Sequence, residues 1–376
     1  MTVASATMPA RAGRDPRLIW GGVAGVLVLV GLFAVVVEVP YLSSFTDWLI
    51  NEVPPLSYLI VQYAVPIAFG AMCGVMCERS GVTNIGIEGM ILTSAFFAFL
   101  TGAYLHTVVG PLPAALSGIV VAIIVAMLLS TLHAWLSITV KADQIISGTV
   151  INILALGGTA FFNQLLVSTT GLSGTDVLPK LDVPAEIATI PLVGPVINAL
   201  FNQGPIAMSL IVFVIVLQVL LFRSRWGLRT RAVGEHPKAA DTVGIDVVRV
   251  RYRSVILGGV FAGLAGAYLT LEQFNSFQDN MTGGVGFIGL AAMIFGRWTP
   301  IGAYGAALLF GTVQSMQLAV RISPPAGDLG AIVSTIPPQI FGMLPYVFTI
   351  IVLAGVVGRA IPPAADGIPY DKEARG

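Results

Sequence analysis

The sequence contains very few charged residues. Of its 376 residues, 10% are Asp, Glu, Lys or Arg and 56% are hydrophobic, and the mean hydropathy is +0.89. A soluble domain carries roughly 25% charged residues, so a soluble body of this size is excluded. Outside one basic loop the chain has no basic face that would neutralise phosphates, which argues against nucleic-acid binding.

Motifs for ATP hydrolysis and for metal binding are also missing. A P-loop requires Gly-Lys followed by Ser or Thr, and none of the four lysines follows a glycine. The two cysteines, Cys73 and Cys77, lie one helical turn apart in an apolar run with too few further ligands nearby for zinc, and we interpret them as packing residues. No HExxH, no GxSxG and no histidine–carboxylate cluster is present. The sequence therefore predicts no enzymatic activity, no bound cofactor and no metal site in this chain.

Long apolar runs recur along the whole chain. A membrane-spanning helix needs about 20 apolar residues, so charge-free runs mark the spans. We predict an all-α polytopic membrane protein with about ten transmembrane helices, and a short surface helix within the polar segment 168–204. The predicted spans are 18–37, 56–77, a third that follows 80–92 and ends near 104, then 114–137, 145–167, 205–222, 254–271, about 283–296, 301–320 and about 336–358.

Basic residues predict the orientation in the membrane. Arg11, Arg14 and Arg17 precede the first span, and cytoplasmic flanks carry an excess of Lys and Arg. With ten spans, Lys180 and Arg321 are the only Lys or Arg residues predicted on the outer side of the membrane. The sequence thus predicts both termini in the cytoplasm. The expected organisation is a cytoplasmic arm (1–17), a transmembrane domain (18–358) that contains a cytoplasmic loop (223–253), and a cytoplasmic tail (359–376).

The spans also predict an internal inverted repeat of five plus five helices. Five spans that start inside are followed by five that start outside, as in transporters built from inverted repeats. The third span of the first half contains Gly86-Ile87-Glu88-Gly89, and the third span of the second half contains Gly286-Phe287-Ile288-Gly289. Gly-interrupted segments at matching places in two halves indicate the transport path.

The candidate residues of this path are mostly uncharged. Ionisable side chains inside spans mark ion or proton relays, and the predicted spans contain almost none. Glu88 is the exception, and two interpretations stay open: a hydrogen-bonding or gating role in the path, or a carboxylate stabilised at a helix N-terminus. Amides in a membrane bundle often join helices, but as a set they suit a neutral polar solute. The candidate path residues are Asn84, Glu88, Gln144, Asn152 and Gln314.

The most basic stretch is the predicted cytoplasmic loop 223–253, which holds eight of the 19 Lys and Arg residues. Its centre, 232–244, reads AVGEHPKAADTVG. Pro237 is tolerated in a first helical turn and Gly244 is able to end a helix, so the pattern predicts a short helix at 238–243 that serves as a docking element. The alternative, that the arginines only set the topology, explains the flanks but not this ordered centre.

Four stretches resemble the branched-chain amino acid, ribose and nucleoside group of ABC importer permeases. The loop pattern G-E-x-P-x-A-A-x-x-x-G-I at 234–245 resembles the ATPase-coupling loop of that group. The segments ERSGVTNIGIEGM (78–90) and GGVGFIGLAAMIFGRWTPIG (283–302) are similar to its early and late motifs. KADQIISGTVIN (141–152) is similar to its nucleoside and simple-sugar subgroup. The resemblance covers roughly 56–358.

The resemblance implies a permease subunit of an ATP-driven importer in the bacterial cytoplasmic membrane. Such permeases move a solute by alternating access, and the subgroup implies a neutral polar solute, above all a nucleoside. Implied partners are a separate ATPase subunit that binds ATP and Mg²⁺, a second permease subunit that forms a heterodimer, and an extracytoplasmic solute-binding lipoprotein. The implied ATPase-coupling residues are Arg231, Gly234, Glu235, Pro237, Lys238, Ala239, Ala240 and Gly244.

Two alternatives to a nucleoside importer remain open from the sequence. The first is a permease for ribose-like sugars, since the four motifs say little about the solute. The second is a stand-alone secondary carrier, which would transport without an ATPase. A membrane enzyme is disfavoured because no catalytic set is visible.

Overall fold

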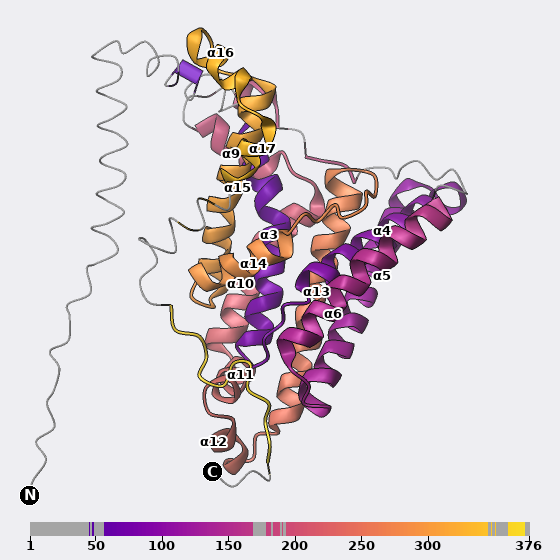
Figure 1. Cartoon of the computed structure of the whole chain (residues 1–376), viewed down its shortest axis with the longest axis vertical. Coiled ribbons are helices and arrows are strands. Elements are labelled where there is room, and N and C mark those ends of the chain that lie inside the picture. Colours follow the sequence, from indigo (N-terminus) through magenta and orange to yellow (C-terminus); the bar gives the residue numbers. More distant parts are fainter. Residues whose placement is uncertain are drawn as a thin grey trace, which may run out of the picture.

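Every regular element in the part of the chain that the structure describes is a helix (Figure 1). The structure is a computed structural model. It describes residues 56–167, 178–181, 183–188, 190, 193–344 and 360–372, together with residues 45, 47, 48, 347 and 350. The predicted all-α class therefore holds for these residues. The predicted arm 1–17 and first span 18–37 lie outside them.

Six helices in the described ranges are long and apolar enough to cross a membrane. Four of the predicted spans match them closely, and the chain is thus a multi-pass membrane protein. The total of ten spans and the inverted repeat stay predictions. The six helices are α3 (Tyr58–Glu78), α4 (Ile87–Val109), α5 (Pro111–Ala134, continued as a π-helical turn to Thr139), α6 (Gln144–Phe162, continued to Val167), α10 (Pro205–Arg223) and α13 (Val247–Tyr268, continued to Gln273).

The C-terminal half contains shorter elements. Helix α14 (Val285–Phe295) has 11 residues, which at 1.5 Å per residue is too short to cross a hydrocarbon core of about 30 Å. Helix α15 (Pro300–Ile322) follows it, and the predicted tenth span, 336–358, is described only at its start. Further short helices are α8 (Ala185–Ala188), α9 (Val193–Phe201), α16 (Asp328–Thr335) and α17 (Pro338–Gly342).

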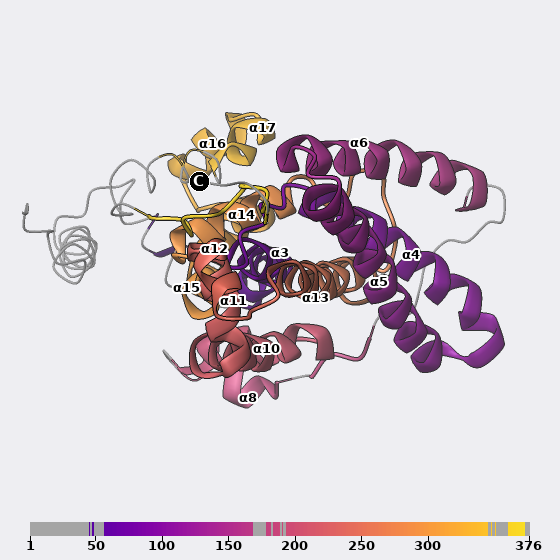
Figure 2. The ribbon, with the colours of Figure 1, turned by 90° about the horizontal axis from the view of Figure 1, so that it is seen from below.

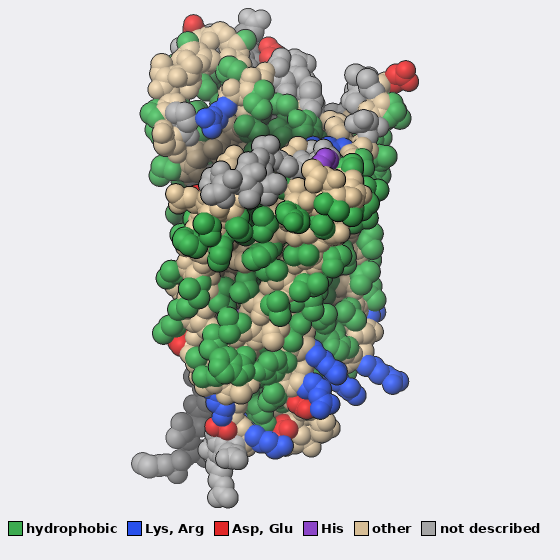
Figure 3. Space-filling model, turned by 90° about the vertical axis from the view of Figure 1, so that its right-hand side faces the viewer, with side chains coloured by type: hydrophobic (Ala, Val, Ile, Leu, Met, Phe, Trp, Pro, Cys, Tyr) green, Lys and Arg blue, Asp and Glu red, His purple; other side chains and the backbone are tan. Residues whose placement is uncertain are grey.

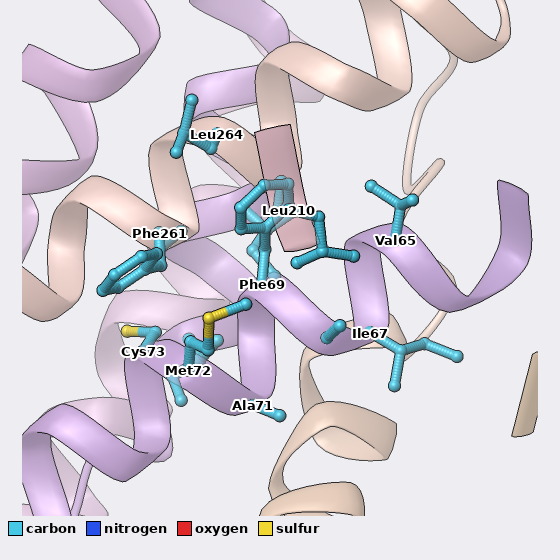
Figure 4. Packing of buried hydrophobic residues seen from close by; sticks show 14 of the residues in the cluster. Val65, Ile67, Phe69, Ala71, Met72, Cys73, Leu210, Phe261 and Leu264 are labelled. Atoms are coloured by element: carbon cyan, nitrogen blue, oxygen red, sulfur yellow. The ribbon is translucent and has the colours of Figure 1, made fainter. Parts of the chain in front are cut away.

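Helices α3 and α13 form the centre of the bundle. Seen from the end that carries α11 and α12, they lie between α4, α5 and α6 on one side and α10 and α15 on the other (Figure 2). Phe69 of α3 stacks on Phe261 of α13, with 6.5 Å between ring centroids, and both pack near Leu210 of α10 (Figure 4). Because these helices are buried by other helices, their polar side chains must find partners within the protein.

Two glycines let α13 approach α5 closely. A β-carbon at Gly263 would lie 2.6 Å from Cα of Ile123, and one at Gly259 would lie 2.9 Å from the carbonyl oxygen of Ala126. Contacts this short leave no room for a side chain, so the small-xxx-small spacing of Gly259 and Gly263 indeed marks close helix packing.

The outer surface of the bundle is an apolar band. Leu128 of α5 and Leu154 of α6 are each 64% exposed. In the space-filling view, hydrophobic side chains cover the middle of the molecule and basic side chains gather at its lower end (Figure 3). This distribution fits a helix bundle that contacts lipid around its middle.

The basic loop is a pair of helices, α11 (Arg225–Glu235) and α12 (Pro237–Thr242), at the lower end of Figure 1. The sequence did not predict α11. Helix α13 begins at Val247, inside the predicted loop 223–253, and already includes Arg249, Arg251 and Arg253. The predicted span starts only at residue 254 because three arginines interrupt the apolar run, although Arg251 is buried in the structure.

Candidate coupling surface and transport path

The predicted docking helix is present in the basic loop. Pro237 is the first residue of α12, where the missing N–H costs nothing. Past its end Gly244 has φ +82°, a conformation that favours glycine, and its N–H donates to the carbonyl oxygen of Asp241 (3.0 Å). The amide of Ile245 donates to the carbonyl of Ala240 (3.0 Å), so the reversal that ends the helix is closed by two hydrogen bonds.

Helix α12 has one buried side and one exposed side. Ala240 is 4% exposed and packs in a small cluster with Val233 of α11 and Val247 of α13. Lys238 and Ala239 are exposed, and Val243, just after the helix, is 74% exposed. An exposed apolar side chain next to small residues on a helix at the end of the bundle forms a surface on which another protein is able to pack.

The other predicted coupling residues hold the loop against neighbouring parts of the chain. A β-carbon at Gly234 would lie 2.3 Å from the carbonyl oxygen of Arg79, so only glycine fits there. The guanidinium of Arg231 lies 5.1 Å from the ring centroid of Phe222 in α10, and that of Arg79 lies 5.4 Å from the same ring. The carboxylate of Glu235 accepts a hydrogen bond from the amide of Ala364 (3.1 Å).

Between α3 and α4 the chain runs without helical structure through residues 79–86, which we call the entry segment. Amide side chains bind its backbone. Oε1 of Gln144 accepts from the N–H of Thr83 (2.7 Å), and Oδ1 of Asn84 accepts from the N–H of Gly86 (3.0 Å). Asn152 on α6 bridges the end of the segment and α4, since its Nδ2 donates to the carbonyl of Ile85 (3.0 Å) and its Oδ1 accepts from the N–H of Gly89 (2.8 Å).

His133 also binds this segment, which we did not predict from the sequence. Its Nε2 lies 3.0 Å from the carbonyl oxygen of Thr83, and its Nδ1 lies 3.0 Å from Oγ of Ser147. The side chain is fully buried. The only available signal was a histidine inside an apolar run, where a buried imidazole must find hydrogen-bond partners.

Glu88 is bound to the N-terminus of a second helix. Its two carboxylate oxygens accept from the amides of Gly284 (2.8 Å) and Gly286 (2.6 Å), at the start of α14. A β-carbon at Gly286 would lie 2.7 Å from the backbone nitrogen of Glu88, so the two Gly-interrupted segments pack directly together. The carboxylate therefore lies at a helix N-terminus, but at that of α14 in addition to the start of its own helix α4, and a role in the transport path stays a prediction.

Glu272 directly follows the predicted span 254–271 and is 2% exposed. It accepts from the amides of Ile206 (2.8 Å) and Ala207 (3.1 Å) at the start of α10. A buried carboxylate therefore binds the first amides of another helix at two places in this bundle. The sequence offers no signal for the second one, because Glu272 follows directly after an apolar run.

Two cavities border the start of α14. One, of about 380 Å³, is lined by Glu88, Asn152, Asn280 and Phe287 among others. The other, of about 300 Å³, is lined on its polar side by Gln273, Thr282, Gln314, Gln317 and Arg321. Asn84 and Gln144 are buried and border neither of these two cavities.

We expect that Asn152→Leu lowers the thermal stability of the purified protein. The amide of Gly89 and the carbonyl of Ile85 would lose their partner, and a buried polar group without one costs about 1–3 kcal/mol. Thr149→Ala on the same helix is the control, since the exposed Thr149 hydroxyl bonds only the carbonyl of Ile145 in its own helix. Thermal unfolding in detergent measures both. Equal midpoints for the two variants would contradict the proposed role of Asn152.

Comparison with known families gives the class of protein. The family model described as "Branched-chain amino acid transport system / permease component" matches residues 57–357. The chain belongs to this permease family. The match spans the entry segment, both cavities and the loop with α11 and α12, so these features lie within the permease component of an ABC transporter.

Three curated relatives cover most of the chain. The guanosine ABC transporter permease protein NupQ of Bacillus subtilis is 39% identical over 83% of this chain and 95% of its own length. The nucleoside ABC transporter permease protein NupC of Lactococcus lactis is 37% identical over 86% of this chain and 99% of its own length. The ABC transporter permease protein TsgC13 of Haloferax volcanii, provisionally named for glucose, is 35% identical over 80% of this chain and 90% of its own length.

Proposed function

We propose that this permease carries nucleosides into the cell as the membrane subunit of an ATP-driven importer. Two relatives that match over nearly their whole lengths are named for guanosine and for nucleosides. The observation that carries the proposal is the polar lining of the 300 Å³ cavity, in which three glutamines face the same space. A nucleoside is neutral and presents hydroxyls and ring nitrogens, which need partners that both donate and accept hydrogen bonds.

Further side chains in this cavity suit such a solute. Oε1 of Gln273 and Oγ1 of Thr282 are buried atoms without a hydrogen-bond partner. Buried polar groups in proteins are rarely left unpaired, so a solute that bonds both would be stabilised there. Tyr63 and Phe274 line the same space and offer aromatic faces to a nucleobase. We propose Gln314 as a solute-contacting residue in this cavity. We also propose that Glu88 and Asn152 shape the path at the 380 Å³ cavity.

The energy for transport is proposed to come from another subunit. The chain contains no P-loop, so ATP and Mg²⁺ would bind to a separate ATPase that packs on the exposed side of α12. A second, different permease subunit and an extracytoplasmic solute-binding lipoprotein complete the proposed importer. Alternating access then opens the path first outward and then inward, with both termini of this chain on the cytoplasmic side.

A ribose-like sugar is the second candidate solute. The relative provisionally named for glucose favours it, and sugar hydroxyls would use the same amide groups. The two solutes differ in the base. A nucleoside has a planar base that would stack on the aromatic side chains that border the cavity, and a free sugar lacks this base.

Uptake by a reconstituted complex tests the proposed function. The tagged chain is co-expressed with its ATPase and second permease, placed in liposomes and given ATP, the binding lipoprotein and radiolabelled nucleoside or ribose. We expect ATP-dependent uptake of the nucleoside that excess ribose does not inhibit. Gln314→Ala should raise the KM about tenfold, the effect of losing one or two hydrogen bonds to solute. Uptake of ribose alone would favour the sugar permease, and uptake by this chain alone would favour a stand-alone carrier.

A further inference from the structure

The C-terminal residues 360–372, which we call the C-terminal tail, lie beyond the family match at 57–357. The tail has no helix. It runs beside α11 and α12 at the lower end of the molecule (Figure 1). The tail nevertheless packs against the rest of the protein, since Pro363 and Ala365 are buried.

On one side the tail binds α11 and α12, the two helices of the basic loop. The amide of Ala365 donates to the carbonyl oxygen of Gly234 (2.8 Å), and the amide of Ala364 donates to the carboxylate of Glu235 (3.1 Å). Nζ of Lys372 lies 3.5 Å from the carboxylate of Asp241 in α12. Two of these contacts use the main chain of the tail, so they do not depend on long exposed side chains.

On the other side the tail binds the membrane helices. The hydroxyl of Thr83, in the entry segment, donates to Oδ1 of Asp366 (3.0 Å), and Nη1 of Arg251 donates to the carbonyl of Ile368 (2.9 Å). Nζ of Lys141 lies 3.2 Å from the carboxylate of Asp371. Each of these three partners belongs to a different part of the transmembrane domain.

The site of Asp366 is enclosed. Burial raises the pKa of the Asp366 carboxyl to about 6, against the opposing effects of the Thr83 hydroxyl and the Arg251 guanidinium. A β-carbon at Gly81, which has φ +85°, would lie 2.7 Å from Nη2 of Arg251 and 3.0 Å from the carbonyl oxygen of Ala365. At Gly81 the entry segment is therefore tightly packed against both the tail and α13.

Apolar packing adds to these hydrogen bonds. The ring of Tyr370 packs against the cluster of Val233, Ala240 and Val247, which come from α11, α12 and α13. Exposed ion pairs such as Lys372–Asp241 contribute little by themselves, because water and salt screen them. The tail is thus held mainly by its main-chain bonds and by Tyr370.

Helix α12 needs such support to transmit force. It has six residues, and a helix of this length is not stable without packing. The entry segment leads directly into Glu88 and α4, and Glu88 binds the start of α14. A link between α12 and the entry segment would therefore connect the loop to the starts of α4 and α14, which line the cavities.

We propose that the C-terminal tail is a strap that holds α12 to the entry segment, so that a displacement of α12 moves the starts of α4 and α14. The role of α12 as the ATPase-binding element rests on the proposed function. The tail residues, Ala364 to Tyr370, act as positioning residues and touch neither solute nor ATP.

Hydrogen exchange on the assembled complex tests the strap without relying on transport. Tyr370→Ala removes the ring from the cluster, and we expect faster amide exchange both in α12 and in the entry segment. Ile361→Ala is the matched control, since Ile361 lies in the same tail and its side chain is 75% exposed. Unchanged exchange in the entry segment of Tyr370→Ala would overturn the proposal, because the tail would then not join the two elements.

Deletion of residues 363–376 tests the consequence for transport. We expect the ATPase to remain bound and its basal activity to stay within about twofold, while nucleoside uptake falls about tenfold, a typical size for a lost coupling. Full uptake by the deleted chain would overturn the proposal. If the deleted chain does not assemble, the exchange and uptake of Tyr370→Ala decide instead. A wild-type complex that moves no nucleoside would refute the proposed function, whereas the exchange result would still decide on the strap.

Discussion

Replacing Glu88 by alanine is expected to abolish uptake and to lower the thermal unfolding midpoint of the purified protein. The buried carboxylate accepts from the amides of Gly284 and Gly286, and alanine leaves both without a partner. Each buried amide left unpaired costs about 1–3 kcal/mol, a large share of the stability of a typical domain. Helix α14 would also lose the negative group at its N-terminus.

Glu88→Gln separates the two roles that a carboxylate has at this site. Glutamine keeps one acceptor oxygen for one amide but loses the negative charge, so an intermediate unfolding midpoint is expected. The measurement is thermal unfolding in detergent next to ATP-dependent uptake in liposomes. A Glu88→Ala protein with the wild-type midpoint and no uptake would show that the carboxylate acts in the transport path, and that the bonds to α14 contribute nothing to stability.

The apolar helices were predictable because lipid excludes charge. Charge-free runs gave α3, α5, α6 and α10 with boundaries shifted by a few residues at most, since a membrane segment must satisfy its backbone within its own helix. Helix α12 was predictable for a different reason. Pro237 at its start and Gly244 past its end restrict the backbone locally, whatever the rest of the chain does.

The failures share one cause, which is that polar groups were paired by residues distant in sequence. The start of α13 was missed because Arg251 interrupts its apolar run, and that side chain is buried where the tail offers the carbonyl of Ile368, 117 positions away. Glu272 and His133 were missed for the same reason. The sequence shows a polar group but not the backbone amide or carbonyl that it will meet.

The candidate path residues show the same limit. A membrane-buried amide is required both where two segments must be joined and where a neutral solute must pass, so residue type alone does not separate the two uses. Gln144 and Asn84 bind backbone of the entry segment and border neither of the two cavities, whereas Gln314 lines the cavity rich in glutamine. Spatial position, which depends on the whole bundle, makes the distinction.

Ala239→Arg is expected to remove ATPase binding and uptake without loss of the membrane fold. Ala239 is exposed on α12, so a longer side chain meets no part of this protein, but it extends into the space that a docked partner must occupy. Residues at the centre of an interface typically contribute about 2 kcal/mol or more, which corresponds to a loss of roughly 30-fold in affinity. Co-purification of the ATPase and ATP-dependent uptake measure the effect.

Two neighbouring substitutions make this result specific. Ala239→Ser keeps a small side chain on the same face and should bind the ATPase as the wild type does. Ala240→Arg places the same charge on the buried face, where Ala240 is 4% exposed against Val233 and Val247, and should destabilise the loop itself. An Ala239→Arg complex whose ATP hydrolysis still responds normally to the solute-binding protein would exclude α12 as the coupling element. The arginines of the loop would then serve only to set the topology, and the energy for transport would have to enter the permease elsewhere.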